Sequence, residues 1–171
     1  MSENLTQTFA RFASELQCED IPATARERCK DLLLDAMACA LAGYEGEDAP
    51  KVSRFAAALG QSHESSVIGS GRLSLTGAAA LNGFLITSVS LCDVYRPTAT
   101  HLQPVVIPPA LAIAERENAS GRDLLTALAA GSSGATPDLN RPTTVPSLPI
   151  RNFSKFQATS PFGSADSVRV L

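Results

Sequence analysis

Helical periodicity runs along the chain as far as Gly131 and then stops, and this change constrains the fold more than any other feature. Beyond it, five of the eleven prolines alternate with Ser, Thr and Asn. Proline removes a backbone donor and breaks helices, and so polar a stretch has little apolar surface to offset the entropy of ordering. We therefore divide the chain into a partial helical domain, residues 1–131, and a Pro/Ser-rich tail, residues 132–171, expected to be largely disordered.

The charge balance excludes one class of partner. Fourteen Lys and Arg against seventeen Asp and Glu give a net charge of -3, and residues 1–131 are the acidic part. Without a basic field, we expect no nucleic-acid partner and no membrane surface.

The longest apolar stretch, Gly77–Val94, is too short and too polar to span a bilayer. The first residues also lack an apolar signal segment. A cytoplasmic location is expected, with the mitochondrion left open.

Four cysteines stand at positions 18, 29, 39 and 92, without a Cys-x-x-Cys pair. Only two histidines could join them, and neither lies at a spacing typical of zinc ligands. We predict buried free thiols in a reducing compartment and no metal site.

Apolar spacing predicts an all-α fold, an incomplete bundle of about six helices with no strand pair. Ser2, Asp48, Ser74 and Ser120 are the expected N-terminal caps, and Phe55 and Leu59 are expected to point inward. The predicted helices cover Ser2–Leu16, Pro22–Gly43, Pro50–Leu59, Ser74–Leu91, Pro108–Glu117 and Gly121–Ala130.

The helix from Ser74 to Leu91 carries small residues that let neighbouring helices approach closely, so it should be central. Gly69-Ser70-Gly71, just before it, has a weak likeness to a dinucleotide-binding turn. It lacks the third glycine and the full preceding strand that such a turn needs. A plain turn before a capped helix is the favoured interpretation.

A polar loop follows the central helix, over residues 92–104, and concentrates most of the chemistry-bearing side chains. It holds Asp93, Tyr95, Arg96 and His101. Loops on a rigid scaffold can direct polar groups towards a substrate, so this loop is the candidate catalytic site. The alternative is structural: Asp93 and Arg96 pair with each other and cap helix ends.

Several stretches in order resemble the N-terminal part of the MmgE/PrpD family, which includes 2-methylcitrate dehydratase and cis-aconitate decarboxylase. None of them is specific alone, but their order is. They are Ile21-Pro22, residues 27–35 and 39–43, Val67-Ile68-Gly69, residues 78–83, residues 105–115 and residues 120–128.

The resemblance implies an all-helical N-terminal domain, a homodimer, and lyase chemistry on small tricarboxylates without a metal or nucleotide cofactor. Such chemistry needs a proton-shuttling group and cations or N–H donors for the carboxylates. His101 matches the family's loop histidine and Asp93 the last acid of its helix-end cluster, so both are candidate catalytic residues. Arg96 is the candidate substrate-binding residue.

The chain departs from the family pattern at several positions in this region. Thr87 stands where the family has a helix histidine, and Ser90 and Cys92 replace the first two acids of the cluster. Leu102 follows His101 where proline is usual.

The resemblance ends at Gly131, which leaves two hypotheses. In the first, the chain is a truncated member of a lyase lineage with little or no turnover alone. In the second, it is a noncatalytic helical module that pairs with itself or with a full-length relative.

Overall fold

The structure is a computed structural model that describes residues 4–95 and 99–135. These residues form six α-helices, one 3-10 turn and one pair of two-residue strands, so the predicted all-α class is confirmed. The prediction for the tail concerns residues that lie, from 136 onward, outside the described part. The elements are α1 (Leu5–Glu15), η1 (Cys18–Asp20), α2 (Ala23–Gly43), α3 (Ala49–Ala58), β1 (Ser65–Ser66), β2 (Arg72–Leu73), α4 (Leu75–Ser88), α5 (Gln103–Arg116) and α6 (Gly121–Ala135).

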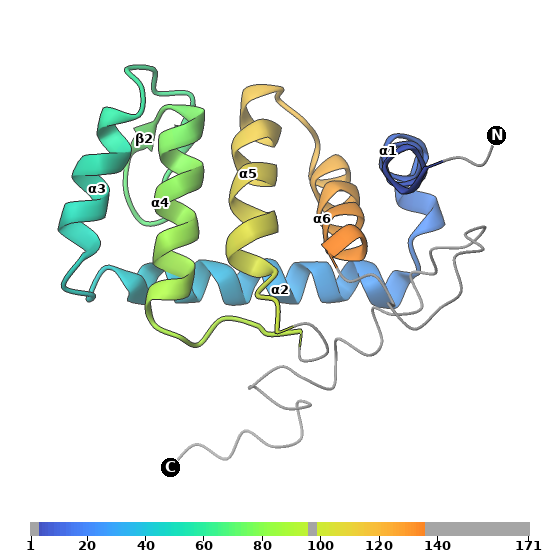
Figure 1. Ribbon diagram of the computed structural model, residues 1–171, viewed down its shortest axis with the longest axis horizontal. Helices are drawn as coiled ribbons and strands as arrows, with labels where there is room; N and C mark the ends of the chain where they lie inside the picture. Colours follow the sequence, from blue (N-terminus) through green and yellow to red (C-terminus); the bar gives the residue numbers. More distant parts are fainter. Residues whose placement is uncertain (1–3, 96–98, 136–171) are drawn as a thin grey trace, which may run out of the picture.

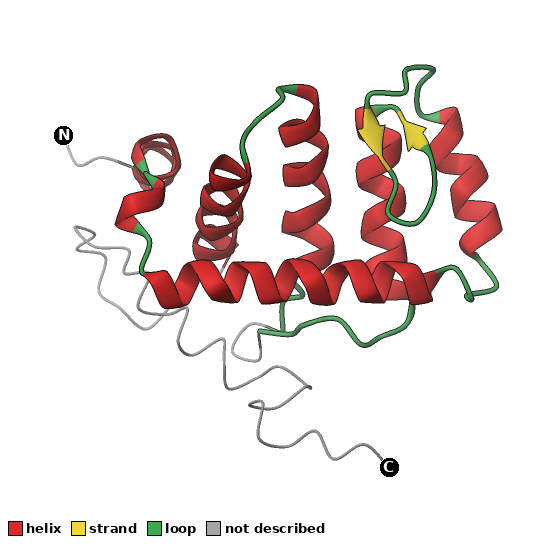
Figure 2. Ribbon diagram, turned by 180° about the vertical axis from the view of Figure 1, so that it is seen from behind, coloured by secondary structure: helices red, strands yellow, loops and turns green. Residues whose placement is uncertain are grey.

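The long helix α2 lies across one end of the other helices. α3, α4, α5 and α6 stand side by side against it, and α1 lies at the far end beyond α6 (Figure 1). Figure 2 shows the short hairpin from behind, and its strands pack against α4 and α5. Within the described residues, no helix is both long and apolar enough to cross a lipid bilayer.

Helix α4 is central, as its small residues predicted, and packs against α2, α3 and α5. Ala78 and Leu85 are fully buried. Glycines allow two of the close approaches: a Cβ at Gly43 of α2 would overlap the Leu85 carbonyl oxygen, and a Cβ at Gly77 would lie 2.5 Å from the carbonyl oxygen of Ala56. Backbones that approach this closely exclude water and fix the crossing of α4 over its neighbours.

The hairpin corrects the prediction that no strands pair. β1 and β2 are antiparallel, with Ser65 opposite Leu73 and Ser66 opposite Arg72. Gly69 in the turn has a φ of 76°, a conformation that favours glycine. The segment 69–71 is thus a hairpin turn, and strands of two residues are too short to produce a sequence period.

Helix α1 begins at a different cap from the expected one. The Asn4 side chain accepts a hydrogen bond from the Gln7 backbone N–H at 2.9 Å, and the Gln7 side chain accepts one from Asn4 N–H. This reciprocal capping box satisfies two free donors, while Ser2 lies outside the described residues. At α3, the Asp48 side chain makes no cap bond and pairs with Lys51 instead.

The inward orientation expected on α3 is wrong for two residues. Phe55 is 61% exposed and Leu59 is 38% exposed, whereas Ala56 is fully buried. Because α3 is an outer helix that packs mainly on α4, only a narrow face of it is covered. The predicted apolar face of α3 is wider than the surface that α4 alone can bury.

Three helix ends also differ from the prediction. α4 stops at Ser88 rather than Leu91, because Ser90 has a φ of 54° and leaves the helical conformation. α5 begins at Gln103, five residues before the expected Pro108. α6 continues past Gly131, where an added Cβ would lie 2.7 Å from Val106 Cγ1. Gly131 therefore serves helix packing and does not end α6.

The predicted caps at Ser74 and Ser120 are confirmed.

Candidate functional site

The candidate site lies in the connection between α4 and α5, where the chain turns back towards α2. Tyr95 and Thr100 pair as an isolated antiparallel bridge, with Tyr95 N–H donating to the Thr100 carbonyl at 2.8 Å. The bridge brings the two arms of the loop together. It sets Asp93, on the first arm, beside His101 on the second.

His101 is exposed, and its ring orientation is set by a backbone group. Its Nδ1 lies 2.6 Å from the carbonyl oxygen of Asp93. A carbonyl oxygen can only accept, so Nδ1 carries the proton in this contact and Nε2 of the neutral ring is left with its lone pair. The ring thus offers Nε2 as a base or hydrogen-bond acceptor.

The Asp93 side chain has different hydrogen-bond partners from the Asp93 backbone carbonyl. The carboxylate is 3% exposed and accepts hydrogen bonds from the N–H groups of Gln103 at 2.8 Å and Leu102 at 3.2 Å. Both N–H groups belong to the first turn of α5, so Asp93 caps that helix. This confirms the capping part of the structural alternative. Arg96, the candidate substrate-binding residue, lies outside the described residues, and so does its pairing with Asp93.

Burial raises the pKa of the Asp93 carboxyl above its ordinary value of 3.8. The N–H groups of Gln103 and Leu102 and the positive form of His101 act in the opposite direction, while the like charge of Asp35 adds to the rise. Desolvation is the largest of these effects because the carboxyl is enclosed by α2 and α5.

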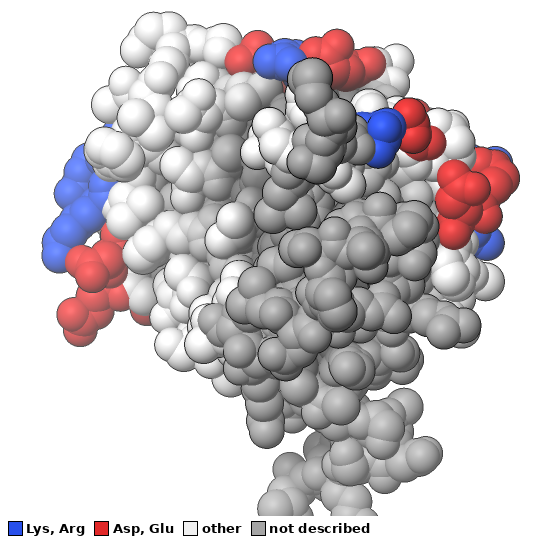
Figure 3. All heavy atoms as spheres, turned by 45° about the vertical axis from the view of Figure 1, so that its right-hand side comes forward, with Lys and Arg blue, Asp and Glu red and all other residues white. Residues whose placement is uncertain are grey.

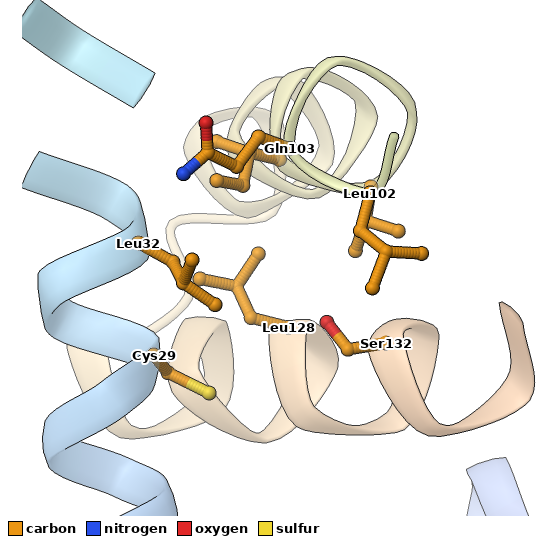
Figure 4. A pocket seen from close by; sticks show the side chains of 8 residues that line it. Cys29, Leu32, Leu102, Gln103, Leu128 and Ser132 are labelled. Atoms are coloured by element: carbon orange, nitrogen blue, oxygen red, sulfur yellow. The ribbon is translucent and has the colours of Figure 1, made fainter. Parts of the chain in front are cut away.

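Gln103 connects this loop to α2. Its side chain is 1% exposed, and its Nε2 donates to Asp35 Oδ2 at 2.7 Å. Its Oε1 accepts from Asp93 N–H at 3.4 Å. Figure 4 shows the Gln103 side chain between α5 and α2, with its amide nitrogen on the α2 side.

Two of the positions that depart from the family pattern meet beside His101. Cys92 Sγ lies 3.8 Å from Thr87 Oγ1 and 3.5 Å from His101 Nδ1. Burial raises the pKa of the Cys92 thiol, so a neutral thiol stands next to the imidazole. Burial, with the charge of Asp35 next, also raises the pKa of Cys39 to about 11.

A small cavity lies behind Gln103, between α2, α5 and α6. Its volume is about 10 Å³, enough for roughly one water molecule. It is lined by Cys29, Leu32, Leu102, Gln103, Val106, Ile107, Leu128 and Ser132 (Figure 4). A metabolite does not fit in this cavity. No group of three His, Cys, Asp or Glu in the described ranges is arranged to hold a metal ion.

On the face drawn in Figure 3, Lys and Arg lie beside Asp or Glu. A shallow groove beside η1 contains three cations, each with a partner: Arg122 pairs with Glu19, Lys30 with Glu27, and Arg26 donates to the carbonyls of Cys18 and Ile21.

The comparisons with known proteins agree with this helical scaffold. Residues 7–133 match the model of the MmgE/PrpD N-terminal domain. The chain therefore belongs to the MmgE/PrpD family. It is similar to the cis-aconitate decarboxylase-like protein oryM of Aspergillus oryzae, at 34% identity over 75% of this chain and 28% of that protein. It is also similar to the cis-aconitate decarboxylase of Aspergillus terreus, at 29% identity over 74% of this chain and 27% of that protein. No solved structure matches the chain.

The chain thus spans less than a third of the length of these relatives. The sequence points to the loop over residues 92–104, and the structure brings two of its candidates, Asp93 and His101, into contact. The sequence did not point to Gln103 or Asp35. Asp35 had a detectable signal, because it lies between Leu32 and Cys39 at helical spacing on the buried side of α2. Gln103 had none while α5 was expected to begin at Pro108.

Proposed function

We propose that this chain is the helical part of a lyase that dehydrates or decarboxylates small tricarboxylates such as 2-methylcitrate or cis-aconitate. The observation that carries the proposal is the contact of His101 Nδ1 with the Asp93 carbonyl, which leaves Nε2 of an exposed imidazole ready to accept a proton. Loss of water or CO2 from a tricarboxylate needs such a proton-transferring group at the reacting carbon. Relatives named as cis-aconitate decarboxylases support the substrate class.

The three candidate residues take different roles in this proposal. His101 transfers the proton, and Arg96 supplies a cation for one substrate carboxylate. Asp93 acts through its backbone carbonyl, which orients His101, because its carboxylate is already engaged by two N–H groups of α5. Asp93 is therefore proposed as a positioning residue, and its carboxylate as a helix cap.

By itself, the 171-residue chain is proposed to be a truncated form with little or no turnover. It covers under a third of the relatives' length, and the cavity behind the site has room for about one water. The test incubates the purified chain with cis-aconitate or 2-methylcitrate and follows loss of CO2 or water by mass spectrometry. Product at the enzyme-free rate is expected. Turnover that His101→Gln removes would overturn the truncation proposal while supporting the lyase assignment.

A noncatalytic pairing module is the second candidate function, and one observation favours it. Leu34, Met37 and Leu41 form an exposed row along α2, with 69%, 43% and 54% of their surface accessible. Their spacing places them on one face, opposite the core. Such a row fits a homodimer or a full-length relative as partner.

Light scattering of the purified chain at several concentrations tests this second candidate. Pairing predicts a dimer that Met37→Glu converts to a monomer, with Lys51→Glu, a substitution on exposed α3, as the matched control. A monomer at every concentration would reject it.

The four free cysteines also support a reducing compartment, and we propose the cytoplasm.

A further inference from the structure

A continuous chain of hydrogen bonds runs from α2 to His101. Gln103 Nε2 donates to Asp35 Oδ2 at 2.7 Å, and Asp93 N–H donates to Gln103 Oε1 at 3.4 Å. His101 Nδ1 then donates to the Asp93 carbonyl oxygen at 2.6 Å. The chain links a scaffold helix to the ring of the proposed proton-transferring residue.

The polarity of this chain is set at the α2 end. The Asp35 Oδ2 atom accepts the hydrogen bond in this contact, so the NH2 end of the Gln103 amide must face α2. The oxygen end of the same amide then faces Asp93 N–H. An amide in the opposite orientation would place two acceptors together at Asp35 and two donors together at Asp93.

Residue 93 is consequently held at three points. Its N–H is bound by the Gln103 side chain, and its carboxylate accepts the N–H groups of Leu102 and Gln103. With both ends fixed, its carbonyl has one direction available, and that direction is occupied by His101 Nδ1. The hydrogen bond between Gln103 and Asp35 joins residues 68 positions apart in sequence, so the loop is held by α2 as well as by its own Tyr95–Thr100 bridge.

We propose that Gln103 and Asp35 are positioning residues that hold His101 in its Nδ1–H tautomer by fixing the backbone of Asp93. The tautomer leaves Nε2 as the basic nitrogen on the exposed side of the ring. Its use in catalysis rests on the proposed lyase function, but the tautomer itself is a property of the folded chain. Neither residue needs to touch the substrate.

Nitrogen NMR of the histidine-labelled chain tests the proposal, because two-bond couplings distinguish the two tautomers of a neutral imidazole. The chain has two histidines, so His63 serves as an internal reference. In the unsubstituted chain, His101 is expected to be mainly Nδ1–H. In Gln103→Ala and Asp35→Ala, the Nδ1–H form is expected to become the minor one, with the signals of His63 unchanged.

Conservative and matched variants separate positioning from general damage. Asp35→Asn keeps an oxygen that can accept from Gln103 Nε2, so it should retain the Nδ1–H form that Asp35→Ala loses. Val105→Ala alters an exposed side chain on the same turn of α5 and should leave His101 unchanged. If Gln103→Ala does not fold, the pair at half-buried Asp35 still decides the question.

Two results would overturn the proposal: an Nε2–H form of His101 in the unsubstituted chain, or an unchanged tautomer in a folded Gln103→Ala or Asp35→Ala variant. Neither depends on turnover. A chain with the expected tautomers but no lyase role in any context would overturn the proposed function alone.

Discussion

Asp93 has two roles, one for its backbone carbonyl and one for its side-chain carboxylate. Its carbonyl fixes the His101 ring, and its carboxylate caps α5 from a position that is 3% exposed. A capping carboxylate is ordinarily stabilised by N–H donors and by the helix dipole. Here burial is the larger effect and raises the pKa of the carboxyl. Ionising this carboxyl in the folded chain therefore costs stability.

That cost predicts a specific pH dependence. Because the folded-state pKa of Asp93 lies above its ordinary value of 3.8, its favourable contribution is complete below that value and is lost as the pH rises through the folded pKa. Asp93→Asn cannot titrate. The free energy of unfolding of the wild-type chain should therefore fall relative to that of Asp93→Asn as the pH rises.

Denaturant unfolding of both proteins between about pH 3 and pH 7 checks this prediction. Asp93→Asn also loses one acceptor for the α5 N–H groups, a roughly constant cost of about 1–3 kcal/mol. Only the slope with pH is informative. If the difference between the two free energies of unfolding does not change with pH, or changes in the opposite direction, the raised pKa of Asp93 would be contradicted.

The cysteines predict a graded thiol reactivity. Burial raises the pKa of Cys29 to about 12, and burial together with the charge of Asp35 raises that of Cys39 to about 11. Cys92 is also buried with a raised pKa, whereas Cys18 is partly exposed. The thiolate is the reacting form, so one thiol should react quickly with a disulfide reagent near neutral pH and three slowly.

Counting the thiol equivalents released in native buffer and in denaturant measures this directly. The Cys18→Ser variant is the control, since it should lose the fast equivalent and keep the slow ones. Two or more fast equivalents in the native chain would show that the core around α2 and α4 opens more readily than its burial indicates.

At the scale of the elements, the fold depends on close contact between α2 and α4. Gly43 of α2 faces the Leu85 carbonyl, and an added Cβ would also lie 2.7 Å from Ser88 Oγ. A backbone carbonyl inside a helix cannot move aside as a flexible side chain can. The crossing of the two helices must shift if the glycine is replaced.

Gly43→Ala should therefore lower the free energy of unfolding by about 1–3 kcal/mol, although alanine is the better helix former. Gly121→Ala is the matched control, because nothing lies within 4 Å of its added Cβ. The control should be neutral or stabilising by up to about 1 kcal/mol. Thermal or denaturant unfolding of both variants checks the pair. Equal effects would contradict the close contact.

The sequence was a good guide to which segments are helical and a poorer guide to where they end. α2 and the caps of α4 and α6 followed from local residues. The start of α5 did not, because two prolines favour a first turn, whereas Pro108 and Pro109 lie inside this helix. The end of α6 was missed because Gly131 contacts Val106, a tertiary contact that no local pattern reveals.

The same division holds for the site. The loop could be selected because polar residues cluster there after an apolar helix. The bridge from Asp35 through Gln103 to Asp93 could not, since it joins residues 68 positions apart. Local periodicity describes single elements, while the site is formed by the way two helices and a loop meet.

For the whole molecule, residues 7–133 match the MmgE/PrpD N-terminal domain, and the chain spans less than a third of the length of the relatives it matches. The described residues supply a helical scaffold and the exposed His101 in the loop between α4 and α5, while most of the relatives' length lies outside the matched segment. If His101 is the proton-transferring residue that we propose, this segment, completed by the rest of a relative, should support catalysis.

The most direct test is the decarboxylation of cis-aconitate by a chimera in which residues 7–133 of this chain replace the matching segment of the Aspergillus terreus decarboxylase. If His101 transfers the proton, we expect loss of CO2 from cis-aconitate at a rate that His101→Gln lowers about 10²–10⁴-fold and Val105→Ala leaves unchanged. A folded chimera without turnover, or one that His101→Gln leaves as active as before, would contradict it.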